Sequence, residues 1–250
     1  MKMKMKTSVE TIAVLHSPYK EKFAVPRQPG LVKSAKAELE ILAPYDDINA
    51  FAGLEAYSHL WLVFIFHKNR KQTWKPMVRP PRLGGNKRLG VFATRSPFRP
   101  NPLGLSLVEF HGIKRKNGKL YLLLSNIDLV DQTPIVDIKP YIPYADSKPN
   151  AIAGFAPHEP EHIVSVHFCE QATQQLNNHQ VKYPSLKQFV REVLQQDPRP
   201  AYKKDQIDSK IYSVHLLDFN ISWTTQGNQT TVINIDIIEV VDHVSQNNNH

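Results

Sequence analysis

The chain has 250 residues, of which 41% are hydrophobic and 22% are charged. This composition is typical of a globular protein and excludes wholesale disorder. No apolar run approaches the roughly 20 residues that span a bilayer, and no apolar segment of a secretory signal follows the basic start MKMKMK. The single cysteine, Cys169, excludes an internal disulfide and a cysteine-rich metal site. We therefore expect a cytoplasmic protein.

The net charge of +8 favours a polyanionic partner, with nucleic acid as the first choice. Ten Lys and Arg residues lie between Lys68 and Arg99, and no Asp or Glu lies among them. A solvated face normally mixes both signs, so this basic block predicts a nucleic-acid contact, although a solubilising loop would have the same composition. The candidate contacts in the block are Arg70, Lys71, Arg82, Lys87 and Arg88.

The first two-thirds of the chain consist of short β-rich runs separated by proline-rich turns. Strands are predicted over 11–17, 37–42, 59–67 and 134–141. Two further β-rich runs flank Asn117-Gly118, which is a strong hairpin signal. Helical periodicity is limited to a short turn near 46–57. Many strands and few helices predict a β-barrel or a curled sheet.

The composition changes after Tyr144, where a small, polar and proline-rich stretch predicts a linker. Beyond the linker, the sequence predicts a strand over 162–168 and a helix over 169–180. An amphipathic helix follows over 185–197, with Ser185 as its cap, and strands are predicted over 210–223 and 230–241. These elements predict a small α+β domain over 161–241.

Common catalytic motifs are missing or broken. The chain has no P-loop and no GxGxxG motif. The run HEPEH, from His158 to His162, has the letters of a zinc-protease motif. Pro160 interrupts the helix that would place both histidines on one face, so we interpret the match as a coincidence and expect no metal.

Three loops combine prolines with polar side chains. GVFATRSPFRPNPLGLS (90–106) carries Arg95 in a frame of three prolines, KFAVPRQPGL (22–31) carries Arg27 and Gln28, and DLVDQTPIVDIKPY (128–141) carries three aspartates. Arginine and loop amides suit a carboxylate or phosphate, whereas carboxylates suit an ammonium group or ribose hydroxyls. Together the loops would bind a small zwitterionic ligand with a ribose; the alternative is a set of structural ion pairs at a barrel rim.

These loops, with the segments RPPRLGGNKRLG and DPRPAY, resemble the TsaA-like family, and within it the bacterial enzymes that modify tRNA. The resemblance covers nearly the whole chain, with the TsaA-like domain over 9–145. It implies an S-adenosylmethionine-dependent methyltransferase on a single-sheeted β-barrel, which forms a homodimer. The substrate would be N6 of threonylcarbamoyladenosine next to the anticodon of threonine tRNAs. The alternative is a non-catalytic module that binds RNA or senses S-adenosylmethionine.

The resemblance also implies roles for individual residues. Gln132 stands where the family commonly has a glycine. Asp131 and Asp137 are the candidates for a catalytic base, with positioning alone as the alternative. From their residue types rather than from the resemblance, Arg199 and Tyr202 of DPRPAY are further candidate tRNA contacts, because a stacking tyrosine beside basic residues suits an RNA loop; a structural turn between helix and strand is the alternative. The expected cofactor contacts are Pro26, Arg27, Gln28, His67, Lys68, Arg95, Leu105, Asp128, Leu129, Val130, Asp131, Thr133 and Pro134.

Overall fold

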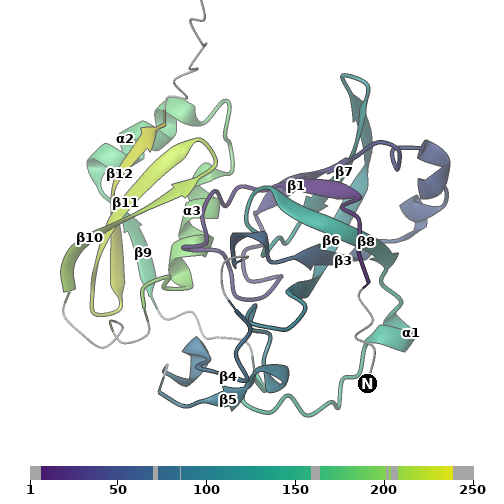
Figure 1. Cartoon of the computed structure of the whole chain (residues 1–250). Helices are drawn as coiled ribbons and strands as arrows, with labels where there is room; N and C mark the ends of the chain where they lie inside the picture. The colour runs from purple at the N-terminus through teal and green to yellow at the C-terminus, as the bar shows by residue number, and fades with distance from the viewer. Residues whose placement is uncertain are drawn as a thin grey trace, which may run out of the picture.

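The computed structural model describes residues 7–69, 73–84, 86–158, 164–200, 203 and 208–238. Figure 1 shows a mainly β part built from the first half of the chain beside a smaller part in which two helices cover a sheet. This arrangement confirms the prediction of a mainly β protein with an α+β C-terminal region. None of the helices in the described part of the chain is long and apolar enough to cross a membrane.

The N-terminal sheet has six antiparallel strands. They are β1 (Ala13–His16), β2 (Lys36–Ile41), β3 (His59–Ile65), β6 (Leu103–Lys116), β7 (Lys119–Ser125) and β8 (Thr133–Pro140). The strand order is β1-β2-β7-β6-β3-β8, and β1 pairs with both β2 and β8, so the pairing closes on itself. Buried and less buried residues alternate along β1 and β3, because one face of the sheet turns inward and the other outward.

The predicted strands of this sheet are confirmed, and the local sequence explains them. The β6–β7 hairpin turns at Asn117 and Gly118, which both have positive φ (52° and 78°), as a two-residue type I′ turn requires. Leucines fill the interior of the sheet, among them Leu15, Leu39, Leu60, Leu62, Leu120 and Leu122. The turn predicted near 46–57 is present as two short 3₁₀ helices, η1 (Ile48–Phe51) and η2 (Leu54–Ala56).

Short elements fill the long connection between β3 and β6 and the exit from β8. The connection contains η3 (His67–Asn69), β4 (Met77–Val78), η4 (Pro81–Leu83), β5 (Leu89–Gly90) and η5 (Val91–Ala93). β4 and β5 pair as a separate two-stranded ribbon, which lies below the two larger parts in Figure 1. After β8 comes the single-turn helix α1 (Pro143–Asp146).

The C-terminal sheet has the order β10-β11-β12-β9, with β9 parallel to β12. Its elements are β9 (Ser165–Phe168), α2 (Glu170–His179), α3 (Leu186–Gln195), β10 (Asp208–Leu216), β11 (Phe219–Gln226) and β12 (Gln229–Ile237). The prediction of one strand over 210–223 is wrong. The chain reverses at Leu217, whose φ is 54°, and leucine is not a turn-forming residue that a sequence reading would mark. Ser185 occupies the predicted cap position of α3, but its side chain makes no capping hydrogen bond.

Residues 17–35 connect the two parts because they leave the N-terminal sheet and pack into the C-terminal core. Tyr19, Val32 and Ala35 belong to the buried cluster that α2, α3 and the C-terminal sheet form. The ring of Tyr19 lies 5.7 Å from that of Phe189 on α3. Glu192, also on α3, accepts hydrogen bonds from both the backbone N–H and the hydroxyl of Ser34. The loop that carries the candidate residues 26–28 is therefore anchored on the C-terminal part.

Gly104 on β6 lies directly beneath the ring of Phe64, its partner on β3. A Cβ at position 104 would lie 2.1 Å from Cζ of Phe64, which is closer than any real contact. We expect Gly104→Ala to lower the free energy of unfolding by about 1–3 kcal/mol, because the buried ring must shift within a packed core. Urea denaturation measures this change.

The matched control is Gly90→Ala. A Cβ at position 90 meets no atom within 4 Å, and its φ of −59° suits any residue. We expect this variant to stay within about 0.5 kcal/mol of the parent protein. Equal losses in the two variants would contradict a packing role for Gly104.

Candidate functional site

Arg95 connects two of the three predicted loops and lies near the third. Its Nη1 donates a hydrogen bond to Oε1 of Gln28, in the loop that packs on the C-terminal part. Its positive charge is also close enough to lower the pKa of the Asp128 carboxyl. Arg95 therefore links loop 90–106 to loop 22–31 by a hydrogen bond and acts on loop 128–141 through its charge.

The fourth predicted segment, His67-Lys68, is linked to the 22–31 loop through the adjacent residue Asn69. Nζ of Lys22 lies 3.5 Å from Oδ1 of Asn69, so the 22–31 loop reaches η3 at the end of β3. His67 is partly buried, whereas Lys68 is exposed.

Pro26, Arg27, Leu105 and Pro134 differ in their surroundings. Pro26 is buried in its loop, and Pro134 pairs with Val14 at the edge of β8. Arg27 is exposed, yet partial desolvation by its neighbours lowers the pKa of its guanidinium, and the nearby Asp197 opposes this shift. The side chain of Leu105 is 53% exposed, so it offers an apolar surface at the site.

In the turn that follows β7, several side chains predicted to contact the cofactor instead stabilise the turn or the core. Leu129 is only 4% exposed and belongs to the core of the N-terminal sheet. Oγ1 of Thr133 donates to the carbonyl of Val130 at 2.6 Å. Gln132 has a φ of 63°, the left-handed conformation that glycine favours, so the turn is kept although glycine is absent. A ligand at this turn would therefore meet mainly backbone from Leu129, Val130 and Thr133.

Asp131 and Asp137, the predicted base candidates, are both engaged in local contacts. Asp131 accepts a hydrogen bond from the backbone N–H of Ser17 at 2.7 Å and forms an ion pair with Lys20 at 3.0 Å. Asp137 forms an ion pair with Lys139 at 2.8 Å and accepts from the N–H of Ile138. Asp131 thus fastens the segment after β1 to the turn after β7.

Asp128 has a different environment. Its carboxylate accepts a hydrogen bond from the hydroxyl of Ser106 at 2.5 Å, and no Lys or Arg in the described part of the chain forms an ion pair with it. Burial raises the pKa of Asp128 to about 6, although the Ser106 hydrogen bond, the backbone and the charge of Arg95 lower it. Asp128 therefore stays protonated to a higher pH than an ordinary aspartate.

Sequence reasoning missed two residues beside Asp128. Ser106 interrupts the apolar run LGLSLVE and is fully buried, and a lone hydroxyl in a β-strand core is the signal that would have found it. Tyr19 is also fully buried, and its hydroxyl makes no hydrogen bond to the residues that the structure describes. Burial raises the pKa of Tyr19, and the nearby carboxylates of Asp128 and Glu192 raise it further.

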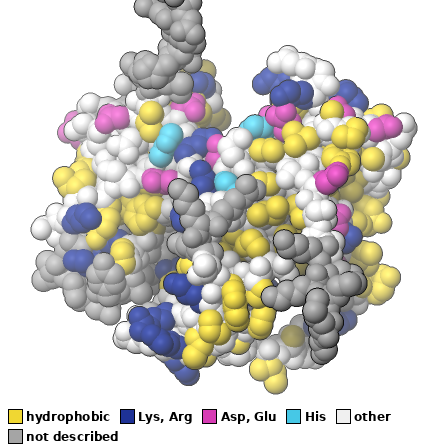
Figure 2. Space-filling view, viewed as in Figure 1, with side chains coloured by type: hydrophobic (Ala, Val, Ile, Leu, Met, Phe, Trp, Pro, Cys, Tyr) yellow, Lys and Arg dark blue, Asp and Glu magenta, His cyan; other side chains and the backbone are white. Residues whose placement is uncertain are grey.

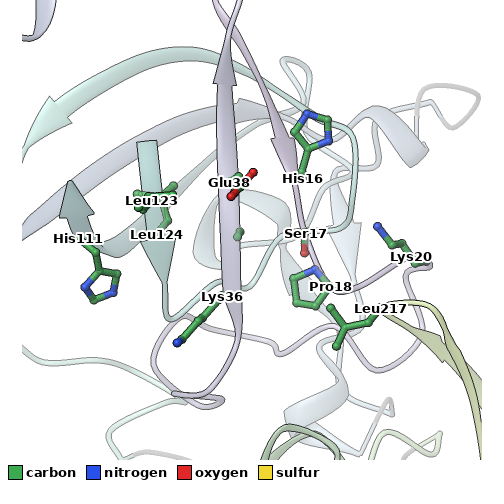
Figure 3. Close-up of a pocket in the computed structure, with 11 residues that line it drawn as sticks. His16, Ser17, Pro18, Lys20, Lys36, Glu38, His111, Leu123, Leu124 and Leu217 are labelled. Carbon is green, nitrogen blue, oxygen red and sulfur yellow. The ribbon is translucent and has the colours of Figure 1, made fainter. Parts of the chain in front are cut away.

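A groove of about 490 Å³ lies beside residues 17–20, between the N-terminal sheet and the β10–β11 turn (Figure 3). Figure 2 shows a notch between the two parts at this place, with histidine and basic side chains on its walls. Ser17 and Lys20, which hold Asp131, also line the groove. The other lining residues are His16, Pro18, Lys36, Ala37, Glu38, His111, Leu123, Leu124 and Leu217.

The predicted tRNA contacts fall into three groups. Arg82, Lys87 and Arg88 are exposed, with Arg82 also donating to the carbonyl of His158. Arg199 is only 1% exposed and forms a bidentate ion pair with Asp197, so the structure shows a structural role for this guanidinium. The predicted contacts Arg70, Lys71 and Tyr202 lie outside the described residues, as do four of the five residues of HEPEH.

Comparisons with known proteins identify the two parts separately. The family model described as "tRNA-methyltransferase O N-terminal domain" matches residues 14–147, and that described as "TrmO C-terminal domain" matches residues 161–238. A tRNA (adenine(37)-N6)-methyltransferase of Escherichia coli is 55% identical over 86% of this chain and 91% of its own length. A putative S-adenosylmethionine-dependent methyltransferase of Pseudomonas aeruginosa is 45% identical over 88% of this chain and 93% of its own. The crystal structure of TrmO from Pseudomonas aeruginosa superposes with a TM-score of 0.76 and 37% identity, over 93% of this chain and 99% of that chain.

Proposed function

The chain belongs to the tRNA-methyltransferase O family, and we propose that it transfers the methyl group of S-adenosylmethionine to N6 of adenosine 37 in tRNA. The observation that carries this proposal is the meeting of the 22–31, 90–106 and 128–141 loops at Arg95. The substrate base would be threonylcarbamoyladenosine next to the anticodon of threonine tRNAs, as the motifs imply. Because tRNA is the substrate, the protein would act in the cytoplasm.

The chemistry of the site fits S-adenosylmethionine, whose groups are an ammonium, a carboxylate, two ribose hydroxyls, an adenine and a sulfonium. The guanidinium of Arg95 and the amide of Gln28 suit a carboxylate, and the 128–134 turn offers carbonyls and N–H groups to hydroxyls. The exposed side chain of Leu105 suits an adenine face. His67, Lys68, Pro26 and Arg27 complete the proposed set of contacts.

When bound, S-adenosylmethionine supplies an electrophilic methyl carbon on a positively charged sulfur. The task of the protein is then to align the acceptor nitrogen with that carbon and to keep water away. Prolines 97, 100 and 102 restrict the 90–106 loop, and Arg99 fastens it further by donating to the carbonyls of Val91 and Thr94. A rigid loop keeps Arg95 in place without an additional loss of conformational freedom on binding.

We propose that the closed N-terminal sheet is the single-sheeted β-barrel that the sequence predicts, with a TsaA-like domain over 9–145 and a C-terminal domain over 161–241. The closed strand order supports the barrel. Residues 17–35, although they belong to the first domain in sequence, pack into the core of the second. The C-terminal domain would therefore support the cofactor loop in addition to any contact that it makes with tRNA.

The exposed cations Arg82, Lys87 and Arg88 would bind phosphates of the tRNA. These cations lie in the same long connection between β3 and β6 that carries Arg95. Binding through phosphates releases counterions, so the affinity for tRNA would fall steeply as salt rises.

A homodimer is supported by the exposed apolar side chains on the same connection. Figure 2 shows hydrophobic side chains gathered at the lower centre, near the place where Figure 1 draws β4 and β5. The large exposed side chains of this connection and of β6 are Trp74, Met77, Phe92, Leu103 and Leu105. A second copy of the chain would cover them, and sedimentation velocity measures the resulting mass.

The methyltransferase proposal is tested by incubating the protein with S-adenosylmethionine that carries a labelled methyl group and with threonine tRNA. We expect label in tRNA that carries threonylcarbamoyladenosine and none in the same tRNA without the threonylcarbamoyl group. Equal labelling would contradict the proposed base. Binding of S-adenosylmethionine by calorimetry with no change in tRNA mass would instead support the alternative, a non-catalytic sensor.

A further inference from the structure

The three aspartates of the 128–141 loop divide into two that are held by lysines and one that is not. Asp131 pairs with Lys20 and Asp137 pairs with Lys139. Asp128 makes no such pair with a described residue, and its side-chain hydrogen-bond partner is the neutral hydroxyl of Ser106. We propose that the carboxylate of Asp128 accepts the proton that the substrate amine loses on methylation, a role that rests on the proposed function.

Asp128 lies among the loops that carry the proposed cofactor contacts. It is near Arg95, which holds Gln28, and its Ser106 neighbour follows the exposed Leu105 directly on β6. The residue as a whole keeps some solvent exposure, although its carboxyl is largely desolvated, so we infer that the substrate amine reaches it from the exposed side. Asp131 is less suitable, because Lys20 and the N–H of Ser17 already occupy its two oxygens.

A proton acceptor accounts for the proton and the charge that methyl transfer would otherwise leave on the substrate nitrogen. The nitrogen–carbon bond forms as the carbon–sulfur bond breaks, and the electron pair of the broken bond remains on sulfur. The amine nitrogen would carry a positive charge unless its proton leaves, and the carbamoyl group on this nitrogen makes it a weak nucleophile. Transfer of the proton to Asp128 leaves a neutral methylated base and a neutral carboxylic acid.

The surroundings of Asp128 set the pH at which it can act. Burial raises its pKa to about 6, while Ser106 on β6 and Arg95 in the 90–106 loop lower it. From the 17–35 segment, Tyr19 faces the same region, with Glu192 of α3 beyond it. A base must be ionised, so kcat/KM is expected to fall about tenfold per pH unit below pH 6 and to level off above it.

The test begins with Asp128→Asn, which keeps the shape of the side chain and removes its basicity. We expect kcat to fall by about 10²–10⁴-fold and the remaining activity to lose its decline below pH 6. Because we propose that the 128–134 turn holds S-adenosylmethionine mainly through backbone groups, the dissociation constants for S-adenosylmethionine and for tRNA, measured by calorimetry, should change by less than about threefold, which is under one kcal/mol. Asp47→Asn, at an exposed cap of η1, is the matched control and should leave both rate and profile unchanged.

Ser106→Ala gives a second measurement. Because the Ser106 hydroxyl lowers the pKa of Asp128, its loss should move the midpoint of the pH profile upward while the plateau rate is retained. Carbon-13 NMR of labelled aspartates reads the same shift in the protein without ligands, where Asp128 should titrate near pH 6 and higher in Ser106→Ala.

Two results would overturn the proposal. A weaker binding of S-adenosylmethionine in Asp128→Asn that accounts for the whole loss of rate would make Asp128 a ligand for the cofactor. An unchanged rate and pH profile in Asp128→Asn would show that positioning alone drives the transfer. Both results require an active parent protein, so they are distinct from failure of the proposed function, in which the parent protein itself labels no tRNA.

Discussion

We expect Arg199→Ala to lower the free energy of unfolding by about 3–5 kcal/mol, because it removes the guanidinium that donates to both oxygens of the buried Asp197 carboxylate. Nε and Nη2 of Arg199 donate to the two oxygens of Asp197 at 2.8 and 3.0 Å. Both side chains are at most 2% exposed. Urea denaturation and thermal melting measure the loss, and the exposed Arg79→Ala serves as the control with a change within about 0.5 kcal/mol.

The double variant Asp197→Asn/Arg199→Met separates a structural role from tRNA binding. Removing both charges also removes the buried carboxylate that would otherwise lose these two hydrogen bonds, so we expect the double variant to be more stable than Arg199→Ala. A normal stability of Arg199→Ala together with a loss of tRNA affinity would contradict the structural role. It would also restore the prediction from sequence that Arg199 contacts tRNA.

The second large effect is expected at Trp223, which is 1% exposed on β11. Its ring is stacked between Phe23, at 5.9 Å, and Tyr212, at 5.8 Å. We expect Trp223→Ala to lower the free energy of unfolding by about 3–5 kcal/mol, because it leaves a large cavity in the C-terminal core.

Trp223→Ala should also act on the cofactor site, since Phe23 belongs to the loop that carries Gln28. Loss of the stacking partner should speed hydrogen exchange in residues 20–28 and weaken the binding of S-adenosylmethionine. Trp223→Phe keeps an aromatic ring beside Phe23 and should show smaller effects in both measurements. Unchanged exchange in residues 20–28 would show that Phe23 is not needed to hold the loop.

The strands of the N-terminal sheet could be predicted because their signals are local. Alternation of apolar residues along 59–65 and the Asn117-Gly118 turn depend only on neighbours in sequence. The reversal at Leu217 could not be predicted, because leucine has no preference for positive φ and the pairing of β10 with β11 decides the turn. Tertiary context overrides local preference at such a position.

The candidate site shows the same division between residue type and residue environment. The sequence showed three aspartates in one loop, and we favoured Asp131 and Asp137 as bases without information on the partners of each carboxyl. The ranking depends on Lys20, which is 111 residues away from Asp131 in sequence, on Lys139 and on the hydroxyl of Ser106. Arg199 is a similar case, because the sequence around a proline-flanked arginine does not show whether its side chain is exposed or buried.

By itself, the sequence determined the mainly β architecture, the family resemblance and the loops that carry the site, because periodicity, turn residues and motif spacing are local properties. Only the tertiary structure decided that residues 17–35 pack against α3 and β11, that Arg199 is buried, and that Asp128 has no cationic partner among the described residues. The physical reason is that burial and charge pairing depend on which distant segments meet. These two quantities set the pKa of Asp128 and, under our proposal, the chemistry of the site.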